Sequence, residues 1–338
     1  MSVRRLKNSY KRVTAMKVII QENIYQKAES VFKDSNLEFI RFNLSEQKRM
    51  VNAQLQTGAG CFIIGAEKYS PNFYEQIKEK SLVIRFGVGY DSVPLDTCSK
   101  RNIYVAYAPN TLDDSVAEFA IALLMSLIRH IPETHCNVKK EIWNGATGLE
   151  LNGKTLAILG FGKIGRKTAQ IGKYGFRMKI NAFDLYLQNN EANLADLYSD
   201  NYQECVADAD FISIHMSVNK ENEGFFNKSK FDLMKKGVFL VNTARGRLIN
   251  EPNLYDALVS GNIAGAALDV YYNEPYLPYP GKDLRTLPNI LLTSHIGSNT
   301  IEANARMAES CIKNVINYYN NQYQSILLVP EIRKVMNY

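Results

Sequence analysis

A short apolar strand that runs directly into a glycine-rich turn constrains this chain more than any other feature. Residues 155–159 have the length and composition of a buried strand. A helical pattern over 166–174 and a second strand-like run over 178–183 follow the turn, and that run ends at Asp184. The turn itself consists of Gly160, Phe161, Gly162, Lys163, Ile164 and Gly165. A strand, a glycine turn, a helix and a strand in this order are typical of a dinucleotide-binding domain.

Each glycine of the turn has a physical reason to be there. Gly160 allows the tight turn out of the strand, Gly162 lets the backbone approach a pyrophosphate, and Gly165 lets the helix pack closely on the sheet. The free N–H groups at the start of the helix then face the phosphates. Asp184 can accept hydrogen bonds from both ribose hydroxyls of an adenosine and would repel a 2′-phosphate, which favours NAD over NADP. The hexapeptide alone is equally typical of an ordinary strand–helix turn.

The composition is that of a globular protein with room for two domains. The chain has 338 residues, and none of its apolar runs approaches the roughly 18 residues of a membrane span. Its net charge of +6 is concentrated before Met16, so charge does not favour nucleic-acid binding, and we expect residues 1–15 to be a flexible basic tail. The cysteines are scattered without a C-x-x-C pair, which predicts reduced thiols in a cytoplasmic protein. We expect no metal site.

Strand-like segments alternate with helical patterns through the first hundred residues. Such alternation predicts a parallel sheet with helices on both faces, where ligands bind beyond the carboxyl ends of the strands. The expected strands are 17–20, 37–41, 61–64, 82–86 and 104–106, and the expected helices are 24–32, 45–56, 72–79 and 95–100. The loops after Ile64 and Phe86 therefore become candidates for ligand binding.

We predict an α/β protein with two domains of the Rossmann-like or flavodoxin-like kind, each with a parallel sheet, and a cofactor cleft between them. The substrate-binding domain is expected to be discontinuous, at 16–107 plus 298–338, if the closing helix packs back on the first sheet. The NAD-binding domain is expected at 108–297. Its segment 112–148 reads as a connector and a helical hairpin. Its apolar helix would suit a homodimer contact, and packing between the two domains is the alternative.

Three polar residues fall in loops after expected strands of the second domain. Arg245, Glu274 and His295 each follow a strand, on the rim where the nicotinamide would lie. The expected elements here are strands 210–215, 238–242, 265–270 and 290–293, with helices 228–235 and 251–259. Arginine can bind a carboxylate through its planar fork, and histidine can pass a proton near neutral pH. Alone, the arginine is more typical of a surface charge, the glutamate of a solvated loop and the histidine of a structural role. Together, beside a dinucleotide fold, they indicate a catalytic set.

The chain resembles the D-2-hydroxyacid dehydrogenase family, in particular its phosphoglycerate dehydrogenase-like branch. The resemblance runs from Met16 onward through several blocks in the family's order. Beyond the glycine turn these blocks are residues 85–91 (RFGVGYD), 116–118 (VAE), 242–246 (NTARG), 267–270 (ALDV), 273–275 (NEP) and 295–298 (HIGS). The family implies a two-domain oxidoreductase that uses NAD and interconverts a D-2-hydroxy acid and its 2-keto acid.

The resemblance also implies roles for matching positions. His295 would be the acid–base, Glu274 would keep it protonated, and Arg245 would bind the substrate carboxylate and carbonyl. The backbone of Val88 and Gly89 would hold the same carboxylate. Asp269 would contact the nicotinamide carboxamide. Further cofactor contacts are implied for His215, Met216, Thr243, Ala244 and Gly297, besides Arg245, His295, Asp184 and the glycine turn. Ser217 and Ser294 stand where the family commonly has proline.

The substrate and even the class of activity have alternatives. We expect the side-chain pocket to come from residues 65–69, Arg85, Tyr90 and Tyr279, with Lys68 able to meet a phosphate and Arg85 equally able to form a salt bridge under the glycine turn at 87–89. Phosphoglycerate dehydrogenase proper, a formate- or phosphite-type dehydrogenase, and an NAD-binding corepressor-like protein remain open. We expect a small 2-keto or 2-hydroxy acid as substrate and a homodimer as the assembly, with no nucleic-acid or membrane partner.

Overall fold

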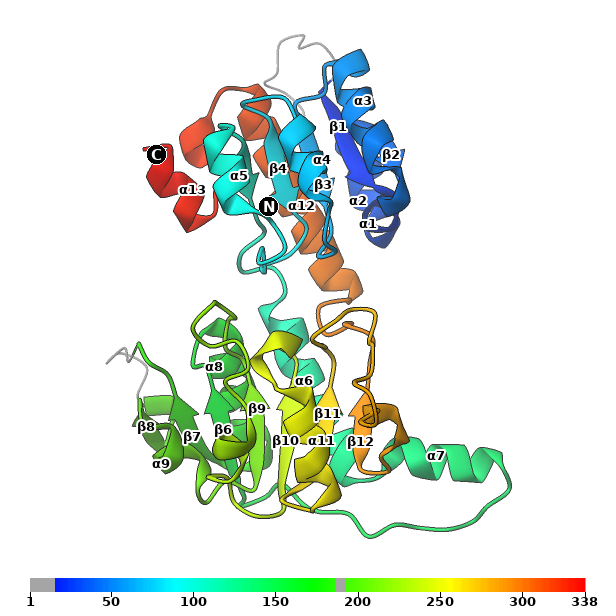
Figure 1. Ribbon diagram of the computed structural model, residues 1–338, viewed down its shortest axis with the longest axis vertical. Helices are drawn as coiled ribbons and strands as arrows, with labels where there is room; N and C mark the ends of the chain where they lie inside the picture. The colour runs from blue at the N-terminus through cyan, green and yellow to red at the C-terminus, as the bar shows by residue number, and fades with distance from the viewer. Residues whose placement is uncertain (1–15, 187–192, 338) are drawn as a thin grey trace. The chain divides into compact units, whose positions relative to one another are not determined.

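The computed structural model describes residues 16–186 and 193–337, so the predicted basic tail at 1–15 lies outside the described residues. The chain divides into two compact units. Unit 1 comprises Met1–Leu112 and Thr300–Tyr338, and unit 2 comprises Asp113–Asn299. Each unit contains one parallel sheet, which confirms the predicted α/β fold class (Figure 1).

Unit 1 is built on a five-stranded parallel sheet in the order β2-β1-β3-β4-β5. Its strands are β1 (Lys17–Gln21), β2 (Glu38–Phe42), β3 (Cys61–Ile64), β4 (Leu82–Arg85) and β5 (Tyr104–Ala106). Its helices in the first segment are α1 (Glu22–Lys27), α2 (Glu29–Lys33), α3 (Gln47–Thr57), α4 (Pro71–Gln76) and α5 (Leu95–Lys100). The central strands β3 and β4 are buried along their whole length, as expected where helices cover both faces of a parallel sheet.

The C-terminal segment belongs to unit 1. Helix α12 (Ile301–Tyr319) places the Tyr319 hydroxyl at the sheet, where it donates to the Lys17 carbonyl (2.6 Å) and accepts from the Gly60 amide (2.9 Å). Helix α13 (Pro330–Val335) follows, and its Ile332 is buried in the core of the unit. Residues more than two hundred positions apart therefore share one core.

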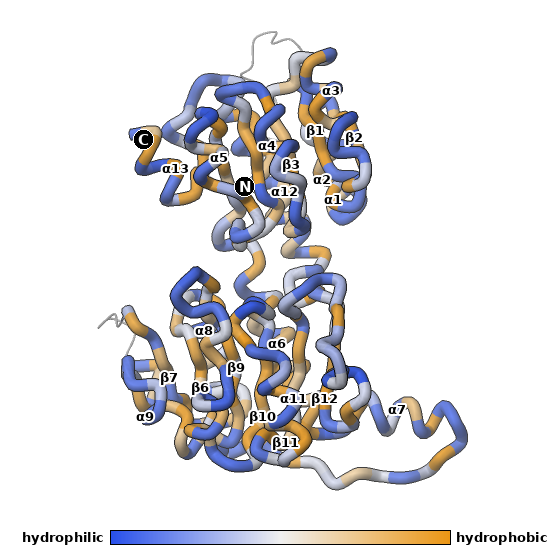
Figure 2. The backbone as a smooth tube through the Cα atoms, viewed as in Figure 1, coloured by the Kyte–Doolittle hydropathy of each residue, from blue (hydrophilic) through white to orange (hydrophobic). Residues whose placement is uncertain are grey.

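Unit 2 is built on a seven-stranded parallel sheet in the order β12-β11-β10-β9-β6-β7-β8. Its strands are β6 (Thr155–Leu159), β7 (Lys179–Phe183), β8 (Leu197–Ser199), β9 (Phe211–Ile214), β10 (Val238–Asn242), β11 (Ile263–Leu268) and β12 (Ile290–Leu292). Its helices are α6 (Asp113–Ile128), α7 (Ile131–Lys139), α8 (Lys163–Gln170), α9 (Tyr202–Val206), α10 (Lys228–Phe231) and α11 (Glu251–Val259). Apolar stretches coincide with the strands of both sheets (Figure 2).

Several predicted boundaries were wrong. The single helix expected at 24–32 is two helices, because Ala28 leaves the helical region (φ −141°). Helix α8 begins at Lys163, inside the glycine turn, rather than at Arg166, and a π-helical turn (Ile171–Gly175) follows it. Strand β11 ends at Leu268, so Asp269 lies in the loop beyond it. The short edge strand β8 was missed because it is only half-buried and has no continuous apolar run.

The apolar helix, expected to suit a dimer contact or to pack between the two domains, is a core helix of unit 2. Helix α6 packs against α8, β10 and β11, with Leu123, Leu124 and Ile128 buried in the core of unit 2. Helix α7 has no buried residue, and it and the following segment extend away from the sheet of unit 2 (Figure 1). Within the described residues, no single helix is long and apolar enough to cross a membrane; α6 and α7 pass that test only as a pair bent by 60°.

Candidate functional site

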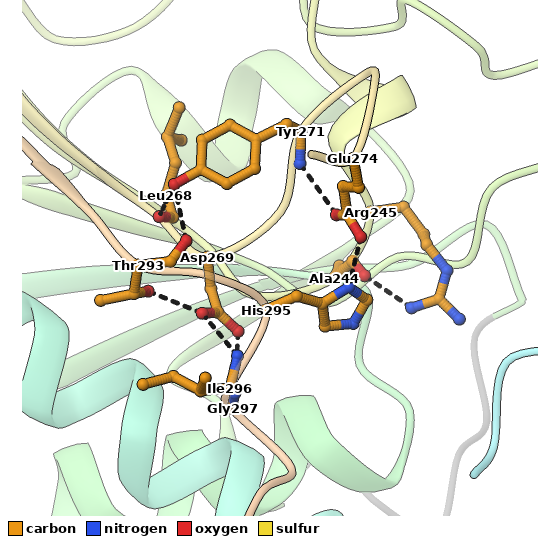
Figure 3. A network of polar contacts seen from close by, with 10 residues as sticks. All are labelled: Ala244, Arg245, Leu268, Asp269, Tyr271, Glu274, Thr293, His295, Ile296 and Gly297. Carbon is orange, nitrogen blue, oxygen red and sulfur yellow. Dashed lines mark hydrogen bonds and ion pairs between the residues drawn. The ribbon is translucent and has the colours of Figure 1, made fainter. Parts of the chain in front are cut away.

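The three predicted catalytic residues lie at the carboxyl edge of the unit 2 sheet. Strands β10, β11 and β12 are adjacent and parallel, so the loops that follow them meet at one edge. Arg245 follows β10, Glu274 follows β11 and His295 follows β12 (Figure 3). Parallel strand order thus brings together side chains that are up to 50 positions apart in sequence.

His295 and Glu274 form a hydrogen-bonded pair. The Nδ1–H group of His295 donates to Glu274 Oε2 at 2.7 Å, and Glu274 Oε1 accepts from the Tyr271 amide at 3.1 Å. Burial raises the pKa of Glu274. The hydrogen bond and charge of His295 lower it, as do the hydrogen bond from the Tyr271 amide and the charge of Arg245. These lowering effects are larger than the effect of burial, so the pKa of Glu274 lies below its usual value. Glu274 is therefore an ionised partner for a protonated imidazole, and it leaves the His295 Nε2 for other contacts.

The loop that carries Arg245 is shaped by Asn242, which is fully buried at the end of β10. The Asn242 side chain donates to the Arg245 carbonyl (3.0 Å) and accepts from the Ala244 amide (3.0 Å). A Cβ atom on Gly246 would overlap the backbone of Tyr271. The Arg245 loop therefore packs directly on the turn that carries Glu274. Gly246 thus positions the Arg245 loop against the turn that carries Glu274. The sequence of the NTARG block alone does not reveal this role.

Asp269 holds the loop of His295 in place. Its Oδ1 accepts from Thr293 Oγ1 (2.6 Å) and the Ile296 amide (2.9 Å), and its Oδ2 accepts from the Gly297 amide (2.8 Å) (Figure 3). The Asp269 carbonyl also accepts from the His295 amide at 2.8 Å. His295 has a left-handed backbone (φ 56°), a conformation that a non-glycine residue keeps only when its surroundings impose it. Asp269 is only 1% exposed, and its carboxylate oxygens accept hydrogen bonds from groups of the protein itself.

The glycine turn has the shape that a pyrophosphate needs. Gly160 has a left-handed φ of 97°, and a Cβ there would lie 2.7 Å from the backbone of His215 and Met216. A Cβ on Gly165 would overlap the Gly160 carbonyl, so the helix and turn are in direct contact. A Cβ on Gly162 would meet nothing within 4 Å. The protein therefore needs glycine for its own packing at positions 160 and 165, whereas at 162 it leaves open space beside the start of α8.

Two further polar groups fit a dinucleotide. Asp184 follows β7, and its carboxylate accepts from the amides of Phe161 (2.8 Å) and Tyr186 (2.9 Å), which fixes it beside the glycine turn. The hydroxyl oxygen of Thr243 is buried and has no hydrogen-bond partner within the described residues, so it can serve a ligand. His215 shares a hydrogen bond with Ser213 Oγ (2.8 Å), and burial lowers the pKa of His215 to about 3.

The predicted residues of the substrate loop lie in unit 1. Gly87 has φ 142°, and its amide donates to the Arg85 carbonyl (2.9 Å), so the chain turns sharply before Val88 and Gly89, which are partly accessible. The Arg85 side chain is buried and donates from Nη1 to the Phe86 carbonyl. The Tyr90 hydroxyl lies 3.2 Å from Glu331.

Tyr279 lies in unit 2, where it lines a shallow hollow of about 440 Å³ with Tyr255, Pro280 and Lys282. None of the three predicted catalytic residues lines this hollow. Among the residues that the structure describes, no group of three or more histidine, cysteine, aspartate or glutamate side chains could hold a metal ion.

Comparison with known proteins places the chain in one family. The family model described as "D-isomer specific 2-hydroxyacid dehydrogenase, NAD binding domain" matches residues 121–297. D-3-phosphoglycerate dehydrogenase of Bacillus subtilis (strain 168) is 36% identical over 276 residues, which are 80% of this chain and 52% of that protein. Glyoxylate reductase of Thermococcus litoralis is 35% identical over 276 residues, 79% of this chain and 82% of that protein.

Solved structures agree. D-lactate dehydrogenase from Escherichia coli superposes with a TM-score of 0.79 at 28% identity, covering 90% of this chain and 98% of that one. D-lactate dehydrogenase from Aquifex aeolicus, complexed with NAD and lactic acid, gives a TM-score of 0.77 at 25% identity, covering 92% and 98%.

The fold and the match thus define a dinucleotide-binding α/β protein that carries a hydrogen-bonded His295–Glu274 pair at its sheet edge. The chain belongs to the D-isomer specific 2-hydroxyacid dehydrogenase family, and residues 121–297 match its NAD-binding domain. This confirms the resemblance and the cofactor predicted from the sequence. The chain spans about half the length of the D-3-phosphoglycerate dehydrogenases of Bacillus subtilis and Archaeoglobus fulgidus, 52% and 57%.

Proposed function

We propose that the protein is an NAD-dependent dehydrogenase that interconverts a D-2-hydroxy acid and its 2-keto acid. The observation that carries this proposal is the His295–Glu274 hydrogen bond at the carboxyl edge of an NAD-binding sheet, with Arg245 on the adjoining loop. A proton donor and a carboxylate-binding cation at that edge are what reduction of a 2-keto acid requires.

In the proposed reaction the residues of this chain handle the proton and the substrate charge. Bound NADH supplies the hydride to the keto carbon. His295, protonated and paired with Glu274, donates its Nε2 proton to the carbonyl oxygen and becomes neutral. The former carbonyl oxygen therefore ends as a neutral hydroxyl group. Arg245 binds the substrate carboxylate and fixes which face of the carbonyl is presented. Oxidation follows the same steps in reverse.

We propose that NAD is held by the glycine turn and the strand ends around it. The turn residues Gly160 to Gly165 would take the pyrophosphate, and Asp184 the adenosine ribose. Thr243, with its unpaired hydroxyl, would serve the nicotinamide side, along with Ala244 and Gly297. His215 and Met216 would lie by the adenosine half. The Asp269 carboxylate is engaged within the protein, so we assign it primarily to positioning His295.

We also propose that the discontinuous unit 1 is the substrate-binding domain. The backbone amides of Val88 and Gly89, which follow the sharp turn at Gly87, would bind the substrate carboxylate. We predict that the protein is located in the cytoplasm. Reduced thiols are expected there, and four of the five cysteines are buried free thiols.

A homodimer is proposed through helix α7 and the segment after it. Apolar side chains are exposed along this segment, including Ile131, Ile142, Leu149 and Trp143, which is 93% exposed. A contiguous exposed apolar surface usually marks an interface. We expect Trp143→Ala to shift the protein from dimer to monomer in analytical ultracentrifugation. Tyr174→Ala, at another exposed aromatic residue of unit 2, should leave the mass unchanged; a monomeric wild type would contradict the proposal.

The decisive experiment is NADH oxidation against a panel of 2-keto acids, comprising glyoxylate, pyruvate, hydroxypyruvate, longer and branched acids, and phosphohydroxypyruvate. We expect turnover with at least one acid and a loss of at least about a hundredfold in kcat for His295→Ala. Turnover of formate or phosphite with NAD, or NADH binding without turnover of any acid, would replace the proposal by a formate-type enzyme or a corepressor-like binding protein, respectively.

A further inference from the structure

A buried carboxylate that the proposed reaction does not use lies behind the turn of Glu274 in unit 2. Glu251 is the first residue of α11 and is only 4% exposed. Its Oε1 accepts a hydrogen bond from the Tyr272 amide at 2.7 Å. Glutamate is almost never buried to this degree unless a partner compensates it, so the contact with Tyr272 accounts for the position of this side chain.

The contact of Glu251 is next to the contact that orients Glu274. The Tyr271 amide donates to Glu274 Oε1 at 3.1 Å (Figure 3), and the Tyr272 amide, one residue later, donates to Glu251. Glu274 contacts His295 Nδ1 with its other oxygen, at 2.7 Å. Two consecutive amides of one turn therefore serve two carboxylates, one in the His295–Glu274 pair and one at the start of a helix.

The segment after β10 holds this turn at two points. Gly246 lies so close to Tyr271 that a Cβ atom on it would overlap the Tyr271 backbone. Asn250 caps α11, and its side chain accepts from a backbone amide of the first turn at 3.1 Å, so Glu251 projects from the fixed start of a helix. Arg245 lies directly before Gly246. The segment that carries the proposed carboxylate-binding residue thus also supports the turn of its partner pair.

The Tyr272 hydroxyl makes a second, outer contact. It donates to Glu223 Oε1 at 3.1 Å, and the same oxygen accepts from Arg247 Nε at 3.2 Å. Tyr272 is 39% exposed, and the side chains of Arg247 and Glu223 are 39% and 29% exposed, so water competes for these contacts. The contact between Glu251 and the Tyr272 amide is the more protected one, because the Glu251 side chain is buried.

Two roles of Glu251 have to be separated. A carboxylate in the first turn of a helix interacts favourably with the helix dipole, and that role depends on charge. An acceptor for the Tyr272 amide depends on the reach of the side chain. Burial raises the pKa of Glu251, whereas the hydrogen bond from Tyr272 lowers it, and the net pKa lies above its usual value. The site therefore disfavours the charge while it satisfies the acceptor.

We propose that Glu251 is a positioning residue for the His295–Glu274 pair, which it aligns by holding the turn 271–274 through the Tyr272 amide. The inference rests on the proposed dehydrogenase function, to which it adds a residue. The role of Glu251 is indirect, since it acts through Glu274 rather than on the reacting atoms. Without its acceptor the turn would open locally, Glu274 would leave the contact with His295 for part of the time, and the protonated imidazole would lose stabilisation.

Glu251→Asp and Glu251→Gln form a matched pair of variants. Aspartate keeps the charge at the start of α11 but is one methylene shorter, so it no longer reaches the Tyr272 amide. Glutamine keeps the reach and an acceptor oxygen but has no charge. We expect Glu251→Asp to lower kcat for keto-acid reduction by about tenfold and to move the decline of reduction to lower pH by up to about one unit, with NADH affinity unchanged. Glu251→Gln should resemble the wild type, whereas a role in the helix dipole predicts the reverse order.

Two further variants test whether the effect passes through Glu274. The double variant Glu251→Asp with Glu274→Gln should show the pH profile of Glu274→Gln alone, because the charge that Glu251 positions is then already absent. Tyr272→Phe removes only the outer hydroxyl contact and should leave the profile in place. An unmoved profile in Glu251→Asp, an equal effect in Glu251→Gln, or an additional shift in the double variant would each overturn the inference.

Amide exchange provides a readout that needs no turnover. Hydrogen–deuterium exchange of the peptide that contains Tyr271 and Tyr272 should be about tenfold faster in Glu251→Asp than in the wild type or in Glu251→Gln. Unchanged exchange in Glu251→Asp would also overturn the inference. A wild type that reduces no 2-keto acid would instead show that the proposed function fails, and the exchange rates would still decide whether Glu251 holds the turn.

Discussion

The charge of Glu274 should set the pH range in which the protein reduces 2-keto acids. Reduction needs His295 protonated, and the Glu274 carboxylate stabilises that form through the 2.7 Å hydrogen bond. In Glu274→Gln the amide can still contact Nδ1 but carries no charge. The protonated imidazole loses stabilisation, so reduction should decline at a lower pH than in the wild type. Oxidation, which needs the neutral ring, should begin at a lower pH for the same reason.

The size of the shift depends on the surroundings of the pair. A hydrogen bond to a charged group contributes about 1.5–3 kcal/mol, but the side chains of His295 and Glu274 are 33% and 36% exposed, so solvent screens their charges. We therefore take the lower end, about 1.5 kcal/mol, which corresponds to roughly 1.1 pH units. The assay is kcat/KM for keto-acid reduction, measured from about two pH units below neutrality to about two pH units above it.

A matched substitution controls for the loss of a carboxylate in general. Glu204→Gln removes a surface carboxylate of unit 2 that accepts from Ser199 and Asn201, and its pH profile should match the wild type. A Glu274→Gln profile that falls in height without moving would mean that Glu274 only holds the Tyr271 turn through its other oxygen. A shift to higher pH would refute the electrostatic reasoning outright.

Three further predictions concern unit 2. Gly162→Ala should weaken NADH binding by about tenfold or more with little change in Tm, because its Cβ meets nothing in the protein. Gly160→Ala should also lower the free energy of unfolding by roughly 1–3 kcal/mol, because residue 160 has a left-handed backbone and close contacts. NADH titration and thermal unfolding distinguish the two variants. Asp184→Ser should raise the NADPH-to-NADH ratio of kcat/KM by about tenfold or more, and an unchanged ratio would contradict its assignment to the ribose. The pKa of His215 is about 3 in the folded protein against an ordinary 6.5, so the unfolded chain binds a proton first as the pH falls below 6.5 and the folded state loses stability. At pH 5.5 the free energy of unfolding should be lower by about 1.4 kcal/mol. Urea unfolding of His215→Gln should not show this loss.

The sequence predicted those parts of the fold that depend on local signals. Continuous apolar runs located β3 and β10 to the residue, because strands buried on both faces need no alternation. Local signals failed where long-range contacts decide. Helix α6 has the composition of an interface helix, and only its neighbours α8, β10 and β11 show that it is a core helix. The break at Ala28 likewise has no glycine or proline to mark it.

The same distinction applies to the site. The meeting of Arg245, Glu274 and His295 at one sheet edge could be predicted because each follows a strand, and parallel strand ends converge whatever the details of packing. The positioning of those residues could not. Asp269 directs both carboxylate oxygens to the loop of His295, and Gly246 lies against Tyr271. Both arrangements depend on contacts between loops that follow different strands.

The loop after β3 in unit 1 is shaped by a contact of the same long-range kind. Read alone, the loop Gly65-Ala66-Glu67-Lys68-Tyr69 offered a lysine, and a lysine suggests phosphate. The fold instead exposes Lys68 and turns Glu67 inward, because Gln21, 46 positions earlier, draws the carboxylate over Gly65. Which side chain of the loop is turned inward thus depends on the strand beside it. The residues of the loop alone therefore could not show that Lys68 is exposed and that Glu67 contacts Gln21.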